Sequence, residues 1–283
     1  MQFTEILSIA IDSLNNDFKT DINSNNYVGD ITTDNFLKFN ETIKAHVVAR
    51  KTLIICGIKF VKEFIKKIDK NIKMEVYFSD GKEVKKNNRI FTLVGSCRNI
   101  LKLERTILNF LQHLSSISTS TNKLVKKLSN SKSKLLDTRK TITNLRILQK
   151  YAVKIGGGFN NRLGLFDEIL IKDNHIKILG GIEKIEEIIK KKKIKKFKIE
   201  CDTINQVKKA ISFNSKYIML DNMNLSQIRR CIKLRKNKKI IFEITGGVNK
   251  KNITNYAKLN AEFISVGFIT QNPEPVDIAI DIY

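Results

Sequence analysis

The sequence has no apolar run of the roughly 18 to 20 residues that a membrane span requires. Its N-terminus, MQFTEILSIAIDSLNND, also lacks the basic start and the small-residue cleavage site of a signal peptide. These two absences argue against a membrane protein and a secreted one. We therefore expect a cytoplasmic protein that inserts into no membrane.

Cysteine is scarce, and no two of the four cysteines have the CxxC spacing of a zinc or redox site. We expect four buried thiols rather than disulfides or metal ligands (Cys56, Cys97, Cys201 and Cys231). The three histidines share no spacing with a carboxylate or a cysteine that would define a metal site or a catalytic triad, and we expect structural roles for them (His46, His113 and His175).

Acidic residues are few, 28 against 52 lysines and arginines, which gives a formal net charge of +24. Nucleic-acid binding is one explanation of such an excess. The lysines are spread along the chain, however, and no motif of the common DNA- or RNA-binding modules is present. The one dense block, Lys190–Lys193 with Lys195 and Lys196, follows a helical pattern of isoleucines. We interpret it as a solvated helix end, where cations suit the helix dipole, with a nucleic-acid patch as the alternative.

The first 115 residues alternate between helical and extended patterns, which is typical of an α+β module. The expected order is a helix over about 3–14, strands between 43 and 58, a helix over 60–68, short strands over 74–97 with a turn at Asp80-Gly81, and a long helix over 98–115. A polar segment rich in serine and lysine, 115–133, then separates this module from the rest.

Beyond that segment, six short apolar runs alternate with amphipathic stretches (134–136, 168–171, 197–199, 217–220, 239–244 and 262–266). Repeated βα units predict a parallel sheet, and about six in succession favour a barrel over an open sheet. A complete eight-stranded barrel usually needs ~250 residues, which is more than this region holds. The predicted fold class is therefore α/β, an open (incomplete) α/β barrel preceded by an α/β domain.

Polar or glycine residues follow each of the six runs: Asp137–Lys140, Lys172-Asp173, Glu200, Asp221, Thr245–Gly247 and Gly267. If the runs are parallel barrel strands, all these groups converge on one face, where barrel active sites lie. The densest stretch, 137–174, combines four cations with three consecutive glycines (Arg139, Lys140, Arg162 and Lys172; Gly156–Gly158). Such a density of positive charge suits a substrate with several carboxylates or phosphates, although a helix C-cap would also explain the glycines.

Glu200 and Asp221 follow successive strands and should lie close together. They could act in acid/base or nucleophilic catalysis, or hold Mg²⁺ attached to a substrate phosphate, and the surrounding cations favour the Mg²⁺ role. A strand-end salt bridge is the structural alternative. The glycines after the last two runs could hold a phosphate through backbone N–H groups or simply make tight turns. Arg105, on the long helix, either snorkels or reaches an anion or a partner subunit.

Long motifs spread over nearly the whole chain resemble the quinolinate phosphoribosyltransferase family, also called carboxylating nicotinate-nucleotide pyrophosphorylases. They are ERTILNFLQHLSSIST (104–119), DTRKT (137–141), LQKYAVKIGGGFNNRLGLFDEILIKDNHI (148–176), IMLDNM (218–223), EITGGVN (243–249) and ISVGFITQNPEPVDIAIDI (264–282). GDITTDNF (29–36) and the Asp80-Gly81 turn extend the likeness into the first domain.

The resemblance implies transfer of phosphoribose from phosphoribosyl pyrophosphate to quinolinate, with loss of CO₂ and pyrophosphate, to give nicotinate mononucleotide for NAD biosynthesis. It also implies an N-terminal α/β sandwich domain over 1–115, rejoined by a C-terminal tail over 273–283, and an open α/β barrel catalytic domain over 116–272. A homodimer, or a higher assembly, with active sites shared between subunits is expected.

The same resemblance assigns the site residues. Arg139, Arg162 and Asn161 would bind quinolinate, with Arg105 supplied by the other subunit. Lys140 and Lys172 would line the pocket and face the phosphates, and Lys140, Glu200 and Asp221 are the expected catalytic groups. Glu200 and Asp221 would hold Mg²⁺ through phosphoribosyl pyrophosphate, while Thr245, Gly246 and Gly267 would surround the 5′-phosphate. Gln271, in the final loop, is a further expected substrate-binding residue.

The sequence departs from the family pattern in the segment GGGFNNR, which usually reads GGGHNHR, so that Phe159 and Asn161 replace histidines. Gln271 replaces a third histidine, and Thr245 replaces a frequent serine. None of these changes removes a charged group from the expected set, and we expect activity to be retained. A related phosphoribosyltransferase with a different acceptor and a basic nucleic-acid-binding protein remain the alternatives.

Overall fold

The computed structural model describes residues 2–37, 41–235 and 239–283. The chain divides into two compact units: unit 1 holds 1–122, 143–157 and 272–283, and unit 2 holds 123–142 and 158–271. This division differs from the predicted domain limits by placing 116–122, 143–157 and 272 with the first unit. Residues 1, 38–40 and 236–238 of the predicted domains lie outside the described residues.

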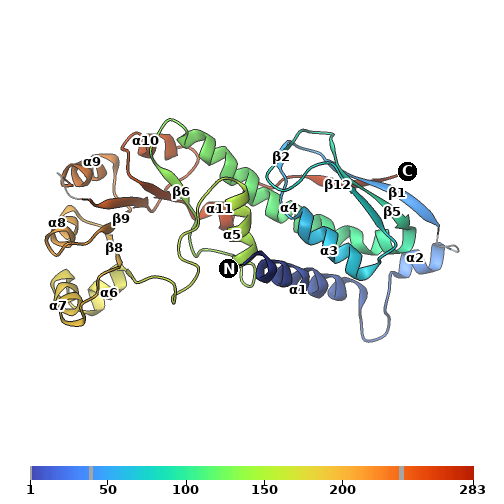
Figure 1. The fold of residues 1–283 in the computed structure, drawn as a ribbon, viewed down its shortest axis with the longest axis horizontal. Helices are drawn as coiled ribbons and strands as arrows, with labels where there is room; N and C mark the ends of the chain where they lie inside the picture. Colours follow the sequence, from blue (N-terminus) through green and yellow to red (C-terminus); the bar gives the residue numbers. More distant parts are fainter. Residues whose placement is uncertain (1, 38–40, 236–238) are drawn as a thin grey trace. The chain divides into compact units, whose positions relative to one another are not determined.

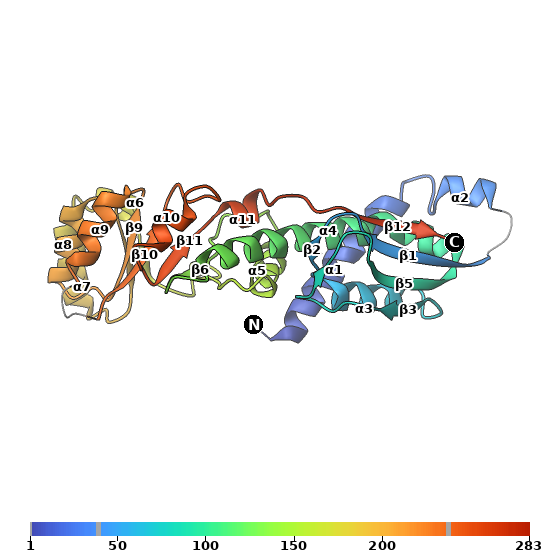
Figure 2. The ribbon, with the colours of Figure 1, turned by 90° about the horizontal axis from the view of Figure 1, so that it is seen from above.

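Unit 1 is built on an antiparallel sheet of strand order β12-β1-β5-β3 (Figures 1 and 2). Its strands are β1 (Thr42–Ala49), β3 (Lys73–Val76), β5 (Arg89–Ser96) and the C-terminal β12 (Ile278–Ile282), and a separate pair joins β2 (Leu53–Ile54) to β4 (Glu83–Val84). The tail thus returns to this unit, with Ile280 paired to Val47.

The helices of unit 1 are α1 (Phe3–Ile22), α2 (Ile31–Phe36), α3 (Ile58–Ile68), α4 (Cys97–Leu128) and α5 (Arg146–Ile155). Their apolar residues recur at helical spacing, as in α1, where Ala10, Leu14 and Phe18 are buried. Phe18 meets Phe64 of α3 edge to face, with ring centroids 5.8 Å apart. The predicted helices and the Asp80-Gly81 turn are confirmed here.

The predicted break at 115–133 is wrong, because α4 continues through the serine-rich segment to Leu128. The hydroxyls there are buried and hydrogen-bond to the strand β2 region. Ser118 Oγ donates to the carbonyl of Ile54 at 2.7 Å, and Thr119 Oγ1 accepts from the Ile54 N–H at 2.9 Å. These small side chains let the helix approach the backbone of β2 while satisfying its polar groups.

Unit 2 is a six-stranded parallel sheet of order β6-β11-β10-β9-β8-β7. The strands are β6 (Lys134–Leu136), β7 (Leu170–Ile171), β8 (Lys198–Cys201), β9 (Tyr217–Asp221), β10 (Ile241–Thr245) and β11 (Phe263–Ser265). All six predicted runs therefore contain strands. The first strand of the unit, β6, pairs with the last, β11. The two edge strands, β6 and β7, do not pair with each other, so the sheet is a barrel that is open between them.

Five helices connect strands of unit 2: α6 (Asp173–Ile178), α7 (Ile182–Lys192), α8 (Ile204–Ser212), α9 (Leu225–Lys233) and α10 (Ile253–Ala257). A sixth helix, α11 (Phe268–Gln271), follows the last strand of the unit. Figures 1 and 2 show α7, α8 and α9 side by side along the outer side of β8 and β9. The lysine block falls at the exposed end of α7, where Lys190 pairs with Glu186 at 2.6 Å, as expected for a solvated helix end. No described helix combines the length and the apolar character that a membrane span needs.

Candidate active site

A cavity of about 570 Å³ lies at the carboxyl ends of the unit 2 strands. Its wall contains every expected site residue except Arg105: Arg139, Lys140, Asn161, Arg162, Lys172, Glu200, Asp221, Thr245, Gly246, Gly267 and Gln271. Most of them lie near the carboxyl end of one of the six parallel strands, and these ends meet at the same edge of the sheet. Asn161 and Arg162 come instead from the segment between α5 and β7. The volume is in the range of pockets for small molecules and cofactors.

One part of the cavity carries two guanidinium groups on different segments. Arg139 follows β6, and its Nε is buried without a hydrogen-bond partner. Arg162 is largely buried, and its Nη1 donates to the carbonyl of Glu168 at 3.0 Å. Burial and the nearby Arg139 both lower the pKa of Arg162. Two cations held close together with an unsatisfied N–H make a site that an anion would stabilise.

The carboxylates lie on neighbouring strands. Glu200 projects from within β8 rather than beyond it, and Asp221 is the last residue of β9. Burial raises the pKa of Glu200, Asp221 adds to that increase, and Lys172 opposes it from 3.2 Å. Neighbouring carboxylates beside a cation can share a divalent ion with substrate oxygens.

Glycines border the cavity where the chain leaves β10 and β11. Gly246 has φ +81°, and a Cβ there would lie 2.2 Å from Oδ1 of Asn222. Only glycine suits this combination of left-handed backbone and close contact. A Cβ on Gly267 would lie 3.1 Å from Cδ of Lys140, which brings this glycine against an expected catalytic residue. Their backbone can therefore approach a phosphate closely.

Polar residues that the sequence analysis did not single out form the floor. Glu243, in the middle of β10, is fully buried and accepts hydrogen bonds from Tyr217 Oη at 2.7 Å, from Asn161 Nδ2 at 3.2 Å and from Ser265 Oγ. Burial raises the pKa of Glu243. A carboxylate inside an apolar run is unusual for a strand core, and this signal in the sequence could have identified Glu243.

The expected residue Arg105 lies elsewhere, on an exposed part of α4 in unit 1. The glycines 156–158 are not part of the cavity wall either. Gly156 ends α5, and a Cβ there would lie 2.5 Å from the carbonyl oxygen of Ser118. This glycine lets α5 pack against α4, and the alternative of a helix C-cap is confirmed at Gly156.

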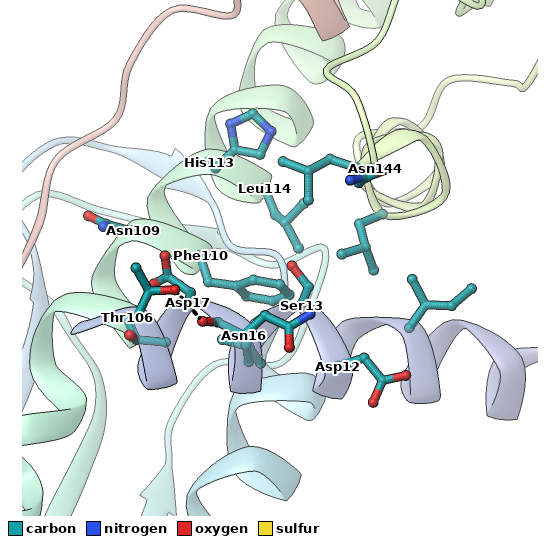
Figure 3. Close-up of a pocket in the computed structure, with 15 residues that line it drawn as sticks. Asp12, Ser13, Asn16, Asp17, Thr106, Asn109, Phe110, His113, Leu114 and Asn144 are labelled. Atoms are coloured by element: carbon teal, nitrogen blue, oxygen red, sulfur yellow. Dashed lines mark hydrogen bonds between the residues drawn. The ribbon is translucent and has the colours of Figure 1, made fainter. Parts of the chain in front are cut away.

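A second cavity, of about 690 Å³, lies in unit 1 between α1, α4 and the start of α5 (Figure 3). Apolar side chains such as Phe110 and Leu148 line it together with Asp12, Asp17 and neutral polar groups. It contains two carboxylates and no lysine or arginine, so it does not suit a substrate with several negative charges. The cavity of unit 2 is the better candidate for the reaction although it is the smaller one.

Each of the three histidines has a hydrogen-bond partner within the fold. His46 Nδ1 lies 2.8 Å from Thr92 Oγ1, His113 lies 2.9 Å from Gln149, and His175 Nδ1 accepts from the Lys172 N–H at 2.9 Å. All four cysteines are buried thiols that form no disulfide bond. Among the described residues, no group of three or more histidine, cysteine or acidic side chains could hold a metal ion. A metal at the cavity would need ligands from a substrate.

Sequence models of two domains match the chain: the N-terminal domain of quinolinate phosphoribosyl transferase over residues 30–115, and its C-terminal domain over residues 117–281. The chain belongs to the quinolinate phosphoribosyl transferase family. A probable carboxylating nicotinate-nucleotide pyrophosphorylase of Methanocaldococcus jannaschii is 39% identical over 267 residues, which cover 90% of this chain and 92% of that protein. The corresponding protein of Bacillus subtilis is 34% identical, with 95% and 92% covered.

Solved structures of this family agree with the fold. The nicotinate-nucleotide pyrophosphorylase of Francisella tularensis has a TM-score of 0.90 and 40% identity, and the similarity covers 98% of this chain and 97% of that one. The enzyme of Ehrlichia chaffeensis has a TM-score of 0.89 and 37% identity, with 100% and 99% covered. The predicted fold, an incomplete α/β barrel with an N-terminal α/β domain, is therefore that of the quinolinate phosphoribosyl transferases.

Phe159 and Asn161 are the two positions of the GGGFNNR segment at which the resemblance implies histidines. Phe159 is half exposed, and its ring lies beneath Nζ of Lys134, 5.0 Å from the centroid. Asn161 remains in the cavity wall, held by Asp137, Glu243 and Lys198. Gln271 also lines the cavity, at the end of α11.

Proposed function

We propose that this chain is a quinolinate phosphoribosyltransferase that forms nicotinate mononucleotide, CO₂ and pyrophosphate from quinolinate and phosphoribosyl pyrophosphate. The observation that carries the proposal is that cations, the carboxylates of Glu200 and Asp221, and glycine turns line the same cavity. The names of the M. jannaschii and B. subtilis relatives, which describe carboxylating nicotinate-nucleotide pyrophosphorylases, support the same reaction.

Quinolinate carries two carboxylates on adjacent ring carbons, and the cavity offers two guanidinium groups to bind them. Arg139 has an unsatisfied buried N–H, and the guanidinium of Arg162 is fixed by the Glu168 carbonyl. A guanidinium can bind a carboxylate through two parallel hydrogen bonds. Asn161 would contact the same substrate from the floor. Lys140 and Lys172 would add positive charge between this end of the cavity and the phosphates.

The phosphoribosyl pyrophosphate would lie toward Glu200, Asp221 and the glycine turns. Mg²⁺ commonly takes only one or two protein carboxylates and completes its shell with substrate phosphates and water, which fits the pair Glu200 and Asp221. When bound, the ion would neutralise the charge of the departing pyrophosphate. Gly246, Gly267, Thr245 and Gln271 would surround the 5′-phosphate.

The reaction needs no protein nucleophile. The ring nitrogen forms a bond to C1′ as the bond from C1′ to pyrophosphate breaks, and the positive charge that develops at C1′ is stabilised by the neighbouring carboxylates. The ring nitrogen then carries a positive charge. The adjacent carboxylate leaves as CO₂, its bonding electron pair stays on the ring carbon next to the charged nitrogen, and a proton completes that carbon. The chain's residues hold the reacting atoms in place and exclude water.

We also propose that the protein is a homodimer in which Arg105 reaches the site of the other subunit. Arg105 is exposed on α4, and it is the one expected substrate-binding residue outside the cavity. Exposed apolar side chains in unit 2 support an interface. Leu165 and Phe166 are 72% and 84% exposed, and burial of such side chains stabilises association.

An acceptor comparison tests the proposed function. Purified protein is given phosphoribosyl pyrophosphate and Mg²⁺ with either quinolinate or nicotinate, and the nucleotide product is quantified by chromatography. We expect nicotinate mononucleotide from quinolinate, its loss when Mg²⁺ is removed with a chelator, and recovery when Mg²⁺ is restored. Because Asn161 and Phe159 replace family histidines, a different acceptor is the second candidate. Product from nicotinate but not from quinolinate would support that candidate instead.

A further inference from the structure

Lys198, the first residue of β8, is a buried cation that belongs to no part of the reaction described above. Its side chain is only 9% exposed. Nζ lies 2.8 Å from Oε2 of Glu168 and 3.2 Å from Oδ1 of Asn161, and it lies above the ring of Tyr217 at 4.3 Å from the centroid. A buried ammonium is costly unless paired, so this one is held in place by specific partners.

Glu168 and Asn161, which bind the ammonium of Lys198, also accept hydrogen bonds from Arg162. The Arg162 backbone N–H donates to Oδ1 of Asn161 at 2.9 Å, and its guanidinium donates to the carbonyl of Glu168 at 3.0 Å. Lys198 therefore binds the same oxygen of Asn161 that holds the Arg162 backbone. It also pairs with the side chain of Glu168, whose backbone carbonyl accepts the hydrogen bond from the Arg162 guanidinium.

The opposite side of the Asn161 amide is held by a carboxylate. Nδ2 donates to Glu243 Oε1 at 3.2 Å, while Oδ1 accepts from Lys198 and from Arg162. A donor pair on one side and an acceptor on the other define which way the amide points. Without Lys198, Oδ1 of Asn161 loses one of its two donors and Glu168 loses its ion pair. The two residues that accept hydrogen bonds from Arg162 are then less firmly held.

We propose that Lys198 is a positioning residue for the acceptor half of the site. Its ammonium fixes Asn161 and Glu168, and through them it orients the Arg162 guanidinium toward a carboxylate of the acceptor. The inference rests on the proposed function in one respect: it takes quinolinate as the ligand of Arg162. It adds that the acceptor affinity depends on a lysine outside the cavity wall, acting through other residues.

Calorimetric titration of quinolinate and of phosphoribosyl pyrophosphate into intact protein tests the inference. We expect Lys198→Met to raise the Kd for quinolinate about tenfold, the order of loss that small misplacement of a binding group produces, and to leave the Kd for phosphoribosyl pyrophosphate within about twofold. The matched control is Lys209→Met, which removes a half-exposed lysine paired with Glu183 on helices of the same unit. It should change neither Kd.

A double-variant cycle separates positioning from a general effect of charge. If Lys198 acts through Asn161, then Lys198→Met combined with Asn161→Ala should bind quinolinate no more weakly than the weaker single variant, within about twofold. Losses that multiply would contradict the inference, as would unchanged quinolinate binding in Lys198→Met or equal weakening of both substrates.

A variant that keeps the buried charge covers the case in which Lys198→Met does not fold. Glu168→Gln removes the ion pair and leaves the Glu168 carbonyl and the ammonium of Lys198 in the chain. We expect it to weaken quinolinate binding in the same direction and by less, and unchanged binding would overturn the inference. Failure of the wild-type protein to bind quinolinate is a distinct result, because it would overturn the proposed function and the inference together.

Discussion

The ammonium nitrogen of Lys172 lies 3.2 Å from Oε2 of Glu200, whose side chain is only 10% exposed while that of Lys172 is 44% exposed. Burial and the charge of Asp221 favour the protonated form of Glu200, and Lys172 favours the ionised form. The pair therefore sets the pH at which the site holds a negative charge next to the expected position of C1′ and Mg²⁺.

Replacement of Lys172 by methionine should move the acidic limb of the activity profile to higher pH. The reason is that the pKa of Glu200 is already raised by burial, and removal of Lys172 takes away the main opposing charge. The pH dependence of kcat/KM is measured for wild type and Lys172→Met. It gives the pH of the acidic limb separately from any decrease in the maximal value of kcat/KM. Lys209→Met is the control and should leave the limb in place. A limb at the same pH in both proteins would show that Glu200 does not control it.

Glu243→Gln should change the pH dependence of stability. Because the folded-state pKa of Glu243 is raised, its contribution to stability is fully present below its ordinary pKa of 4.5 and is lost as the pH rises through the folded value. Glutamine keeps the shape without that ionisation. The free energy of unfolding of wild type relative to Glu243→Gln should therefore decrease as the pH rises above about 4.5. Urea denaturation at several pH values measures it, and a difference that increases with pH would refute the assignment.

Gly246→Ala should be much more damaging than Gly180→Ala, although both glycines have φ +81°. At Gly180 no atom lies within 4 Å of the new Cβ, so only the backbone strain of roughly 1–2 kcal/mol is expected. At Gly246 the Cβ would also meet Asn222 at 2.2 Å, which displaces the turn. We expect Gly246→Ala to raise the KM for phosphoribosyl pyrophosphate about tenfold or more and Gly180→Ala to leave it unchanged. Equal kinetic effects would show that the turn does not bind the phosphate.

Mixing two inactive variants tests whether sites are shared between subunits. Arg105→Ala and Lys140→Ala remove groups from different units of the chain. If Arg105 serves the neighbouring subunit, a mixed dimer contains one site with both defects and one with neither. After subunit exchange the mixture should regain up to roughly a quarter of wild-type activity, since half of the dimers are mixed and each has one intact site of two. Absence of any recovery, with exchange verified by tagged subunits, would mean that each chain forms its own site.

Much of the site could be predicted because working groups in a parallel sheet follow buried strands. The β-branched runs around Ile199, Ile218 and Ile244 identified the strands, and the polar residues next to them identified the cavity wall. The family motifs then assigned the roles. Strand ends were less certain, which is why Glu200, expected just beyond a strand, lies within β8.

The features that the sequence did not reveal depend on tertiary contacts. The second half of helix α4 is rich in serine and reads as polar in the sequence, yet Ser118 and Thr119 are buried. Their hydroxyl groups hydrogen-bond to the backbone carbonyl and the backbone N–H of Ile54 in β2. Lys198 resembles any lysine at a strand start until Asn161, which is distant in sequence, is brought to it. The place of Gly156 at the end of a helix follows from the sequence pattern, but its close packing against Ser118 of α4 does not. In each case a partner remote in sequence decides the role.

The most direct test of the central claim is the stoichiometry of a single reaction in wild type and in Lys140→Met. Quinolinate labelled in the carboxylate adjacent to the ring nitrogen is incubated with phosphoribosyl pyrophosphate, Mg²⁺ and protein, and labelled CO₂, pyrophosphate and nicotinate mononucleotide are measured together. We predict equal amounts of the three products from wild type and at least a roughly hundredfold slower reaction in Lys140→Met, as expected for loss of a charged group at the reacting centre. Absence of labelled CO₂ from the wild-type protein, or full activity in Lys140→Met, would contradict the assignment of this reaction to the unit 2 cavity.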